Sequence, residues 1–534
     1  MKAWILVLAG LLPAPRVEGA KPVILPPPGP RSQAASPATS APRLNVVEHR
    51  LKNGMKLLIV ERHVAPTVAA FILFKVGGVN DPAGQTGVAH LLEHMMFKGT
   101  RTLGTTNYAA ERPLMEREDQ LSVELQRSEY RARTDPFYHA DPAQVDRLKK
   151  QIAQVQSQEK RYIVENELDE AYDHLGAENL NASTGSDGTT YVVELPSNAL
   201  EAWAYAGSDR IRNPVFREFY SERDVVHEER RMRTETAPEG LIEETLNATA
   251  FVAHPYHDPV IGWPSDIDNT ERAEVLAYFR THYAPNNAVA AVVGDVNPRA
   301  VIRLAEKYFG AIPPQPQPSQ PVTIEPEQHG ERRATVVFDA NPQFSMAYHI
   351  PAIGHADAPA LEMLGDLLSS GRTSRFYAAI TQKGLGQASA DGGTGPYPNL
   401  FGIAGIPQQP TTSADLERAI LAEIERVKTE PVSDRDLQRL RNQLDAATVR
   451  ELESNSGIAS LLLDYESKAS DWRYYYKELA LLKAVTPADL MRVARKYLTA
   501  ENRTVVTLVA PSETPGASRP SPASGAVSER EGGK

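Results

Sequence analysis

The sequence predicts an α+β protein built from two similar domains, and three observations support this prediction. The chain has 534 residues, which is more than one compact hydrophobic core usually accommodates. A Pro- and Gln-rich stretch at 312–318 interrupts otherwise globular sequence, as is typical of an extended linker. The segments on either side, about 45–311 and 331–510, repeat one pattern of strands and helices, which indicates an internal duplication.

Each copy of the pattern begins with two strand-like apolar runs and a helix that ends at a glycine. In the first copy these elements are Lys56–Val60, Val68–Phe74 and the helix Val88–Lys98. In the second copy they are Ala334–Phe338, Met346–Ile350 and the helix Leu361–Ser370. Both copies close with a further helix and a strand. When the two helices are aligned on the glycines that follow them, their apolar positions agree, but residues suited to binding a metal occur only in the first.

The first copy carries additional sequence from about 108 to 172, rich in charge and with helical spacing. It is broken at Asp135-Pro136 and again at Asp141-Pro142. Because proline ends helices, the segment is expected to be a helical hairpin inserted in the first domain.

The two ends of the chain differ from the rest in composition. A basic start and a short apolar run predict a signal peptide at 1–20, and this run is too short for a stable membrane span. A Pro-rich disordered tether is expected at 21–44 and a disordered polar tail at 511–534. We therefore expect a periplasmic or secreted protein.

Composition narrows the possible functions. The net charge of -11 provides no electrostatic footprint for nucleic acid. The chain has no cysteine, so any transition-metal site must use histidine and carboxylate ligands.

The helix in the first copy contains the motif His90-Leu91-Leu92-Glu93-His94. The apolar residues around it form a buried stripe, which leaves His90, Glu93 and His94 on the other face. Two histidines one turn apart can bind one zinc ion, and Glu93 lies where it can act as general base toward water. This inverted His-x-x-Glu-His order is a known signature of zinc peptidases.

A catalytic zinc site needs a third protein ligand and leaves a fourth position open. The best candidate segment is Ser221–Arg230, in which helical spacing places Glu222, Val226 and Glu229 on one face. Without the zinc motif, these acidic residues would be interpreted as a solvated helix face.

With these motifs the chain resembles the pitrilysin family of zinc peptidases, which includes insulin-degrading enzyme and mitochondrial processing peptidase. The resemblance implies that Glu229 is the third metal ligand and that Glu222 supports the site from close by. His94 and Glu229 lie farther apart in sequence than is usual in the family, and the predicted insertion accounts for the excess.

Asn181-Ala182-Ser183-Thr184 resembles the family's edge strand beside the metal, which implies that Asn181 and Ala182 bind substrate as an added strand. Read without the family, this segment is a polar turn and strand. His227, His254 and His257 are expected to be packing or surface residues.

The resemblance covers roughly residues 45–510 and implies a definite architecture. Each domain is expected to be an antiparallel-rich sheet covered by helices, and the two domains to face each other across a cavity that admits unfolded peptides. We expect a zinc-binding peptidase domain at 45–311, a linker at 312–330 and an inactive homologous domain at 331–510.

One departure from the family bears on partners. Many active relatives carry an Arg and a Tyr that stabilise the oxyanion, but the equivalent stretch here, Ile380–Ser389, contains neither. Loss of an oxyanion donor costs about 10² to 10³ in rate. The expected assembly is a hetero-oligomer with a zinc-free homologue that supplies the pair, or a homodimer.

Two functions compete. The first is a zinc-dependent metalloendopeptidase with one Zn²⁺ per chain that cleaves extended peptides or unfolded polypeptides. The alternative is a catalytically silent family member that acts as a scaffold or assembly subunit. Silent members typically lose a His or Glu of the motif, so the presence of His90, Glu93, His94 and Glu229 favours the enzyme.

Overall fold

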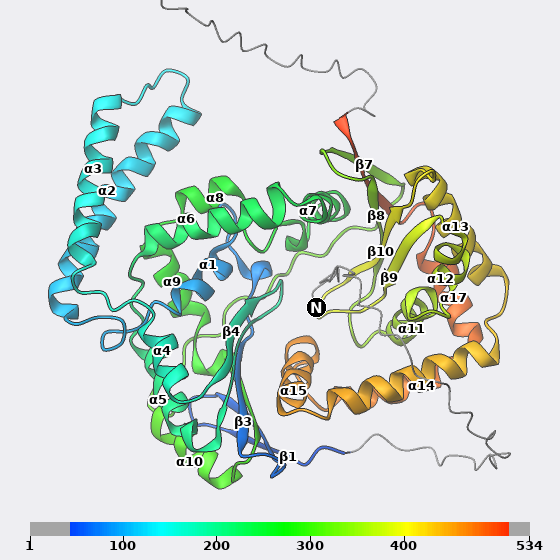
Figure 1. Ribbon diagram of the computed structural model, residues 1–534, viewed down its shortest axis with the longest axis horizontal. Coiled ribbons are helices and arrows are strands. Elements are labelled where there is room, and N and C mark those ends of the chain that lie inside the picture. The colour runs from blue at the N-terminus through cyan, green and yellow to red at the C-terminus, as the bar shows by residue number, and fades with distance from the viewer. Residues whose placement is uncertain (1–42, 512–534) are drawn as a thin grey trace, which may run out of the picture. The chain divides into compact units, whose positions relative to one another are not determined.

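Two mixed β-sheets, each with its own helices, organise residues 43–511, which are the part of the chain that this computed structural model describes (Figure 1). The α+β prediction is therefore confirmed. The predicted signal peptide at 1–20, and most of the tether and tail predicted at 21–44 and 511–534, lie outside the described residues.

The first sheet has six strands in the order β1-β2-β6-β3-β5-β4. Only β2 and β6 pair in parallel, and all other neighbours are antiparallel. The central strands β3 and β6 are buried almost throughout, as expected for continuous apolar runs. The strands are β1 (Val46–Arg50), β2 (Lys56–Glu61), β3 (Thr67–Phe74), β4 (Glu178–Thr184), β5 (Thr189–Pro196) and β6 (Ala288–Gly294).

The second sheet has five strands in the order β7-β11-β8-β10-β9. Its one parallel pair is β7 with β11, so its order and strand directions repeat those of β2-β6-β3-β5-β4. The strands are β7 (Arg332–Val337), β8 (Gln343–Ile350), β9 (Gly386–Asp391), β10 (Asn399–Pro407) and β11 (Arg503–Val509).

Helices follow the strands in both halves. Those before the second sheet are α1 (Val88–Met95), α2 (Tyr108–Thr134), α3 (Pro142–Glu159), α4 (Glu167–His174), α5 (Leu200–Arg212), α6 (Phe219–Arg230), α7 (Pro238–Ala250), α8 (Pro264–Asn269), α9 (Arg272–His282) and α10 (Pro298–Tyr308). Those after the start of the second sheet are α11 (Ala358–Ser369), α12 (Arg375–Ala379), α13 (Ser413–Thr429), α14 (Asp434–Glu451), α15 (Asn455–Ala469), α16 (Tyr474–Ala484) and α17 (Pro487–Tyr497).

The two halves exchange one helix each. α15, from the second half, packs on β3 and β6 of the first sheet, whereas α7, from the first half, packs on β7, β8 and β11 (Figure 1). Ile242 of α7 thus joins a small apolar cluster with Val506 and Leu508 of β11. Each sheet therefore has one face buried by a helix from the other half of the chain.

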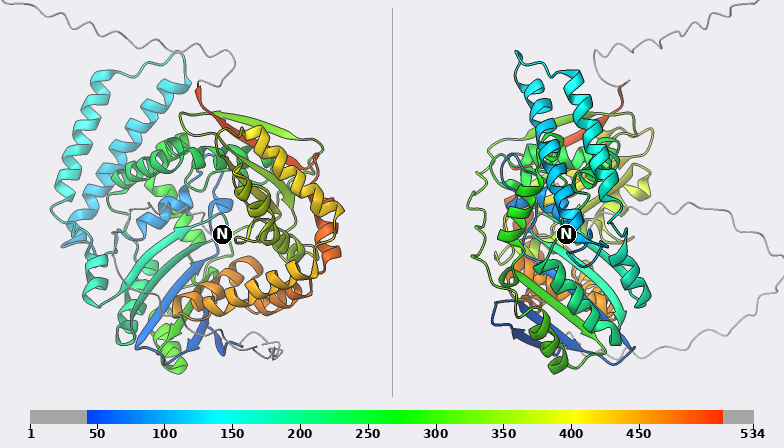
Figure 2. Two further views of the ribbon diagram at one scale, coloured as in Figure 1. Left: turned by 45° about the vertical axis from the view of Figure 1, so that its right-hand side comes forward. Right: turned by 90° about the vertical axis from the view of Figure 1, so that its left-hand side faces the viewer.

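The inserted segment forms α2 and α3, which lie side by side as a hairpin and are followed by α4 (Figures 1 and 2). Leu121, Leu148 and Val155 form a small core between the helices. The hairpin begins at Asn107, whose side chain accepts a hydrogen bond from the Ala110 N–H, a common helix start.

Helix ends differ slightly from the sequence prediction. The helix predicted at Val88–Lys98 ends at Met95, because the N–H groups of Phe97 and Lys98 bond to carbonyls only three residues back. The helix predicted at Leu361–Ser370 begins earlier, at Ala358, with Pro359 in its first turn, a position that suits proline.

The segment between α10 and β7 contains no helix or strand, and Val322 and Ile324 within it are highly exposed. Among the described residues, no helix combines the length and apolar composition required to cross a membrane.

Candidate metal centre

The helix α1 holds the motif by burying its apolar side. Leu91, Leu92 and Met95 are at most 2% exposed, so the helix cannot rotate without exposing them. Its N-terminus is fixed by Asp81, whose carboxylate accepts hydrogen bonds from the N–H groups of Gly87 and Ala89 at 2.8 and 3.1 Å. An acidic group at a helix N-terminus is favourable for the helix dipole. These contacts set the direction in which the motif side chains point.

The helix α6 packs against α1 and brings the acidic residues. Val226 is completely buried and anchors the face that also carries Glu222 and Glu229. As the spacing of the sequence predicts, both carboxylates thereby reach α1.

The structure brings His90, His94 and Glu229 together. The Oε2 atom of Glu229 lies 3.6 Å from Nε2 of His90 and 3.3 Å from Nε2 of His94. Two ligand atoms that bind one tetrahedral zinc at about 2.1 Å are about 3.4 Å apart. In residues 43–511 this is the only group of three His, Asp or Glu side chains whose ligand atoms all lie within 4.8 Å of one another. The donor set therefore fits a zinc ion.

Glu222 and Glu229 each use one carboxylate oxygen to face a histidine, while the second oxygen binds a lysine or an arginine. Glu222 accepts a hydrogen bond from Nδ1 of His94 at 2.9 Å, while Lys98 binds its second oxygen at 2.6 Å. Arg233 binds Oε1 of Glu229 at 2.6 Å, which leaves Oε2 directed at the histidines. Contacts of this kind orient metal ligands. By contrast, Nδ1 of His90 is buried without a hydrogen-bond partner among the described residues.

The electrostatics of these side chains separate the two histidines. Burial, followed by the neighbouring His94, lowers the pKa of His90 to about 4. Burial also disfavours charged His94, but Glu222 and Glu229 outweigh it and raise the pKa of His94 to about 9. Burial likewise opposes ionisation of both carboxyls, yet their cationic partners hold the pKa of Glu222 and of Glu229 below the ordinary value.

Glu93 lies on the same face of α1 and is 9% exposed. Its Oε2 accepts a hydrogen bond from the hydroxyl of Thr184 at 2.5 Å, which ties it to the end of β4. Burial raises the pKa of Glu93, although the bond from Thr184 partly offsets this effect. A carboxylate with a raised pKa is better suited to accept and return a proton near neutral pH.

Asn181 and Ala182 lie on β4, the last strand of the first sheet, opposite Val192 and Tyr191 of β5. Among the described strands, β4 pairs only with β5, so its outer edge is available for a further strand. β4 also carries Thr184, which donates the hydrogen bond to Glu93. The predicted substrate-binding residues and this hydrogen-bond donor therefore belong to one strand.

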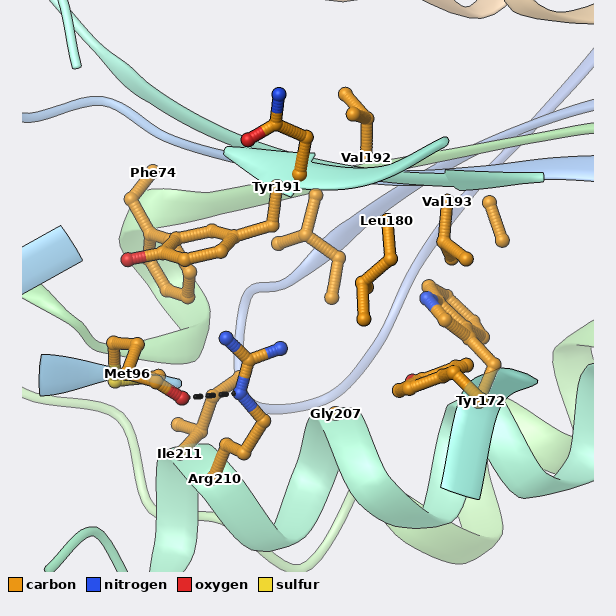
Figure 3. Close-up of a pocket in the computed structure, with 14 residues that line it drawn as sticks. Phe74, Met96, Tyr172, Leu180, Tyr191, Val192, Val193, Gly207, Arg210 and Ile211 are labelled. Atoms are coloured by element: carbon orange, nitrogen blue, oxygen red, sulfur yellow. Dashed lines mark hydrogen bonds between the residues drawn. The ribbon is translucent and has the colours of Figure 1, made fainter. Parts of the chain in front are cut away.

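A small cavity of about 30 Å³ lies beneath this strand, and the side chain of Arg210 lines it (Figure 3). Its Nε donates a hydrogen bond to the carbonyl of Met96 at 2.7 Å, and its guanidinium lies over the rings of Phe97 and Tyr191. Arg210 thus ties α5 to the C-terminal end of α1, where a cation is favourable.

Several of these contacts were not predicted from the sequence. Arg233 stands four residues after Glu229 and Lys98 four residues after His94, so helical spacing could have indicated both. Thr184 lies in the segment already singled out beside Asn181. No local signal points to Arg210, because its contacts come from the two residues after α1 and from β5.

Other histidines contact groups outside the metal centre. Nε2 of His227 lies 2.9 Å from Asp268. His254 is 2% exposed and packs against Tyr256 and Tyr397.

The fold and this site together define a two-domain α+β protein with a zinc-peptidase-type motif in its first half only. Family models agree. The model for insulinase (peptidase family M16) matches residues 56–115 and 156–262, and the model for the peptidase M16 inactive domain matches residues 269–444. Together they cover more than half of the chain, which therefore belongs to the M16 peptidase family. The family resemblance predicted from the motifs is confirmed.

Individual relatives extend along most of the chain. The zinc protease PqqE of Helicobacter pylori is 28% identical over 474 residues, covering 86% of this chain and 91% of the relative. A protein named "Probable mitochondrial-processing peptidase subunit beta" of Arabidopsis thaliana is 25% identical over 479 residues, covering 86% and 77%. The crystal structure of a protease from Helicobacter pylori matches with a TM-score of 0.71 and 26% identity, covering 88% of this chain and 100% of that one.

Proposed function

We propose that this chain is a zinc-dependent metalloendopeptidase that hydrolyses peptide bonds in extended peptides or unfolded polypeptides, with one Zn²⁺ per chain. The observation that carries the proposal is the convergence of His90, His94 and Glu229 beside the buried carboxylate of Glu93. Zinc bound by such a set acts as a Lewis acid and activates water. Kinship with proteins named zinc proteases supports the same class.

Glu93 is the proposed general base. Its carboxylate accepts a proton as water attacks the peptide carbonyl and then donates that proton to the leaving amine nitrogen. The hydroxyl of Thr184 holds one oxygen of Glu93 and leaves the other to receive the proton. Burial of the carboxylate raises its pKa toward the operating pH, which suits a group that first accepts a proton and then returns it.

Glu222 and Arg233 are proposed to position the metal ligands. Glu222 holds Nδ1 of His94, so that Nε2 faces the metal. Arg233 engages one oxygen of Glu229 and keeps the other for the metal. The substrate is proposed to extend the first sheet along β4, beside Asn181 and Ala182, since main-chain pairing at a sheet edge suits an extended peptide.

The active assembly is proposed to include a zinc-free homologue that supplies the Arg and Tyr missing from Ile380–Ser389; a homodimer is the alternative. One relative is named as a subunit of a processing peptidase, which supports an assembly of this kind.

The apolar leader supports export to the periplasm or beyond. We further propose the domain limits 45–311 and 331–510, with a linker at 312–330. The interruption of the insulinase match between 115 and 156 supports an insertion at about 108–172.

The experiment uses the chain without residues 1–20, with its zinc content measured and a quenched peptide as substrate. The wild type is expected to bind one zinc and cleave, whereas Glu93→Gln should retain zinc and lose about 10² to 10⁴ in rate. Stoichiometric zinc without cleavage, even after addition of the zinc-free homologue, would support the silent scaffold instead.

A further inference from the structure

A second, larger cavity of about 730 Å³ is lined by residues from both halves of the chain. Lys75 and Asp187 line it from the first half, and Tyr397 and Tyr474 line it from the second. None of the metal-binding group His90, His94 and Glu229 belongs to its lining.

The cavity adjoins the two segments that hold the metal centre. Asp187 lies in the turn after β4, three residues beyond Thr184, whose hydroxyl bonds to Glu93. Asn80 lies immediately before Asp81, whose carboxylate holds the start of α1. A peptide paired along β4, as proposed above, would therefore extend toward this cavity.

The charges on the cavity wall are unequal. Four cations line it, and Asp187 is the only acidic residue among the lining side chains. Lys468 is neutralised by Asp464 at 2.8 Å. Lys56 and Lys75 share one buried carboxylate, that of Glu466, at 2.7 and 3.4 Å.

Lys56 also lies 3.9 Å from Glu48, whereas the long contact with Glu466 is the one ion pair of Lys75 among the described residues, so Lys75 is the lysine with incomplete compensation. The Arg50 guanidinium donates a hydrogen bond to the neutral carbonyl of Gly54, so its charge adds to that of Lys75. Lys75 is 27% exposed, and its contacts with Glu466 and Ser470 are long, at 3.4 and 3.5 Å. Burial and the nearby Lys56 lower the pKa of Lys75, as expected for an ammonium with incomplete compensation.

We propose that this cavity binds a carboxylate of the peptide substrate through Lys75 and Arg50, so that the chain selects acidic peptides. The carboxylate belongs either to an acidic side chain or to the peptide's C-terminus. The inference rests on the proposed peptidase function and specifies its substrate class. Uncompensated cations around a partly enclosed cavity favour such a group, because charge pairs are screened less there than at an open surface.

Binding is measured with the Glu93→Gln chain by fluorescence anisotropy, using three labelled peptides of equal length. One is neutral and amidated at its C-terminus, one is neutral with a free C-terminus, and one is amidated with internal acidic residues. A chelator is present, so that a carboxylate bound to zinc cannot account for the result. At least one carboxylate peptide is expected to bind about tenfold more tightly than the neutral amide, and salt should reduce the difference. Whichever of the two carboxylate peptides binds more tightly shows whether the C-terminus or an acidic side chain supplies the carboxylate.

Lys75→Met and Arg50→Gln should each remove about three- to tenfold of this preference. Lys149→Met is the matched control, because Lys149 lies on the hairpin helix α3 and pairs there with Glu129. Two variants are used because loss of Lys75 also weakens its contact with Glu466. Equal affinity for all three peptides, or equal effects of the Lys75 and Lys149 variants, would overturn the proposal. Cleavage by the wild type is assayed in parallel. If the wild type cleaves but the chain shows no preference for carboxylate peptides, only the cavity proposal is wrong. If the chain prefers carboxylate peptides but does not cleave, only the proposed peptidase function is wrong.

Discussion

The helices α1 and α11 occupy equivalent places in the two halves but differ in what they offer a ligand. α1 follows β2 and β3, and α11 follows their counterparts β7 and β8; apart from the additional strand β1, the two sheets have the same strand order. When aligned on Gly99 and Gly371, His90, Glu93 and His94 correspond to Glu362, Gly365 and Asp366. The architecture is repeated, whereas the metal-binding group is present only in the first half of the described chain.

Packing explains why the position in α11 that corresponds to Glu93 cannot hold a glutamate side chain. In the first half, the side chain of Glu93 fills the space between α1 and β4 and meets Thr184. In the second half, a Cβ added at Gly365 would lie 2.8 Å from the backbone nitrogen of Gly392, just beyond β9. A Cβ at Gly392 would in turn lie 2.1 Å from the carbonyl oxygen of Leu361. Two glycines therefore close the gap that holds the side chain of Glu93 in the first half.

The two halves of this molecule share a fold, but they do not share the side chains that could bind a metal. Both sheets and their helices are needed to bury the core, including the exchanged helices α7 and α15. The proposed chemistry depends on a few side chains of α1 and α6, in keeping with the general rule that function lies in sites placed on folds.

The largest expected effect comes from replacing Glu229, the proposed third metal ligand. Glu229→Gln should weaken zinc binding by about 100-fold or more, because a neutral amide replaces a charged ligand. Glu222→Gln should weaken it by about 10-fold, because Glu222 only orients His94. Competition with a fluorescent zinc chelator measures both affinities. The reverse order would mean that the two acidic residues of α6 have been assigned the wrong roles.

The glycine contact in the second half should be intolerant of even one methyl group. Gly365→Ala is expected to lower the free energy of unfolding by about 1 to 3 kcal/mol, because the added carbon meets backbone that cannot move freely. Gly402→Ala is the matched control, since a Cβ there meets nothing within 4 Å. Urea denaturation of both variants tests the idea, and equal stability would show that the gap between α11 and β9 is not closed.

The two helices are also anchored differently at their N-termini, which predicts a pH dependence for the second half. The Asp357 carboxylate before α11 binds Lys496 and Tyr497, both at 2.8 Å, and also Arg492. Although burial opposes it, these partners hold the pKa of Asp357 well below its ordinary value. The folded state therefore binds this proton less readily than the unfolded state, so the stabilisation is complete above pH 4 and is lost as the pH falls further.

Asp357→Asn should accordingly cost about 2 kcal/mol at pH 7, and the difference from wild type should shrink between about pH 4 and pH 2. Chemical denaturation across this range measures it. A difference that grows on acidification would contradict the assignment.

The smallest predicted effect concerns Arg233 in the first half. Arg233→Met should weaken zinc binding by about tenfold, because Glu229 loses the partner that fixes one of its oxygens. Arg233→Lys should restore part of the affinity. Arg231→Met is the control, since Arg231 lies in the same turn but pairs with Glu228. If both Met variants bind zinc like the wild type, Arg233 has no positioning role.

Much of this organisation could be predicted from local sequence. The apolar runs located most of β2, β3 and β6, and helical spacing placed His90, Glu93 and His94 on one face of α1. Glu229 is less evident from local sequence, because the long insertion separates it from His94. The bond between Thr184 and Glu93 and the placement of Arg210 depend on how the strands and helices pack, which sequence periodicity does not specify. The exchange of α7 and α15 likewise arises from tertiary packing, since each helix covers a sheet from the other half of the chain.

The proposed function requires that one zinc ion bind in the first half through His90, His94 and Glu229. X-ray absorption spectroscopy of the zinc-loaded chain, combined with metal titration, tests it directly. We expect one zinc per chain with two imidazole nitrogens and carboxylate or water oxygens at about 2.0 to 2.2 Å, and loss of one imidazole in His90→Ala. An unchanged spectrum in His90→Ala, or zinc retained at full affinity in that variant, would contradict it.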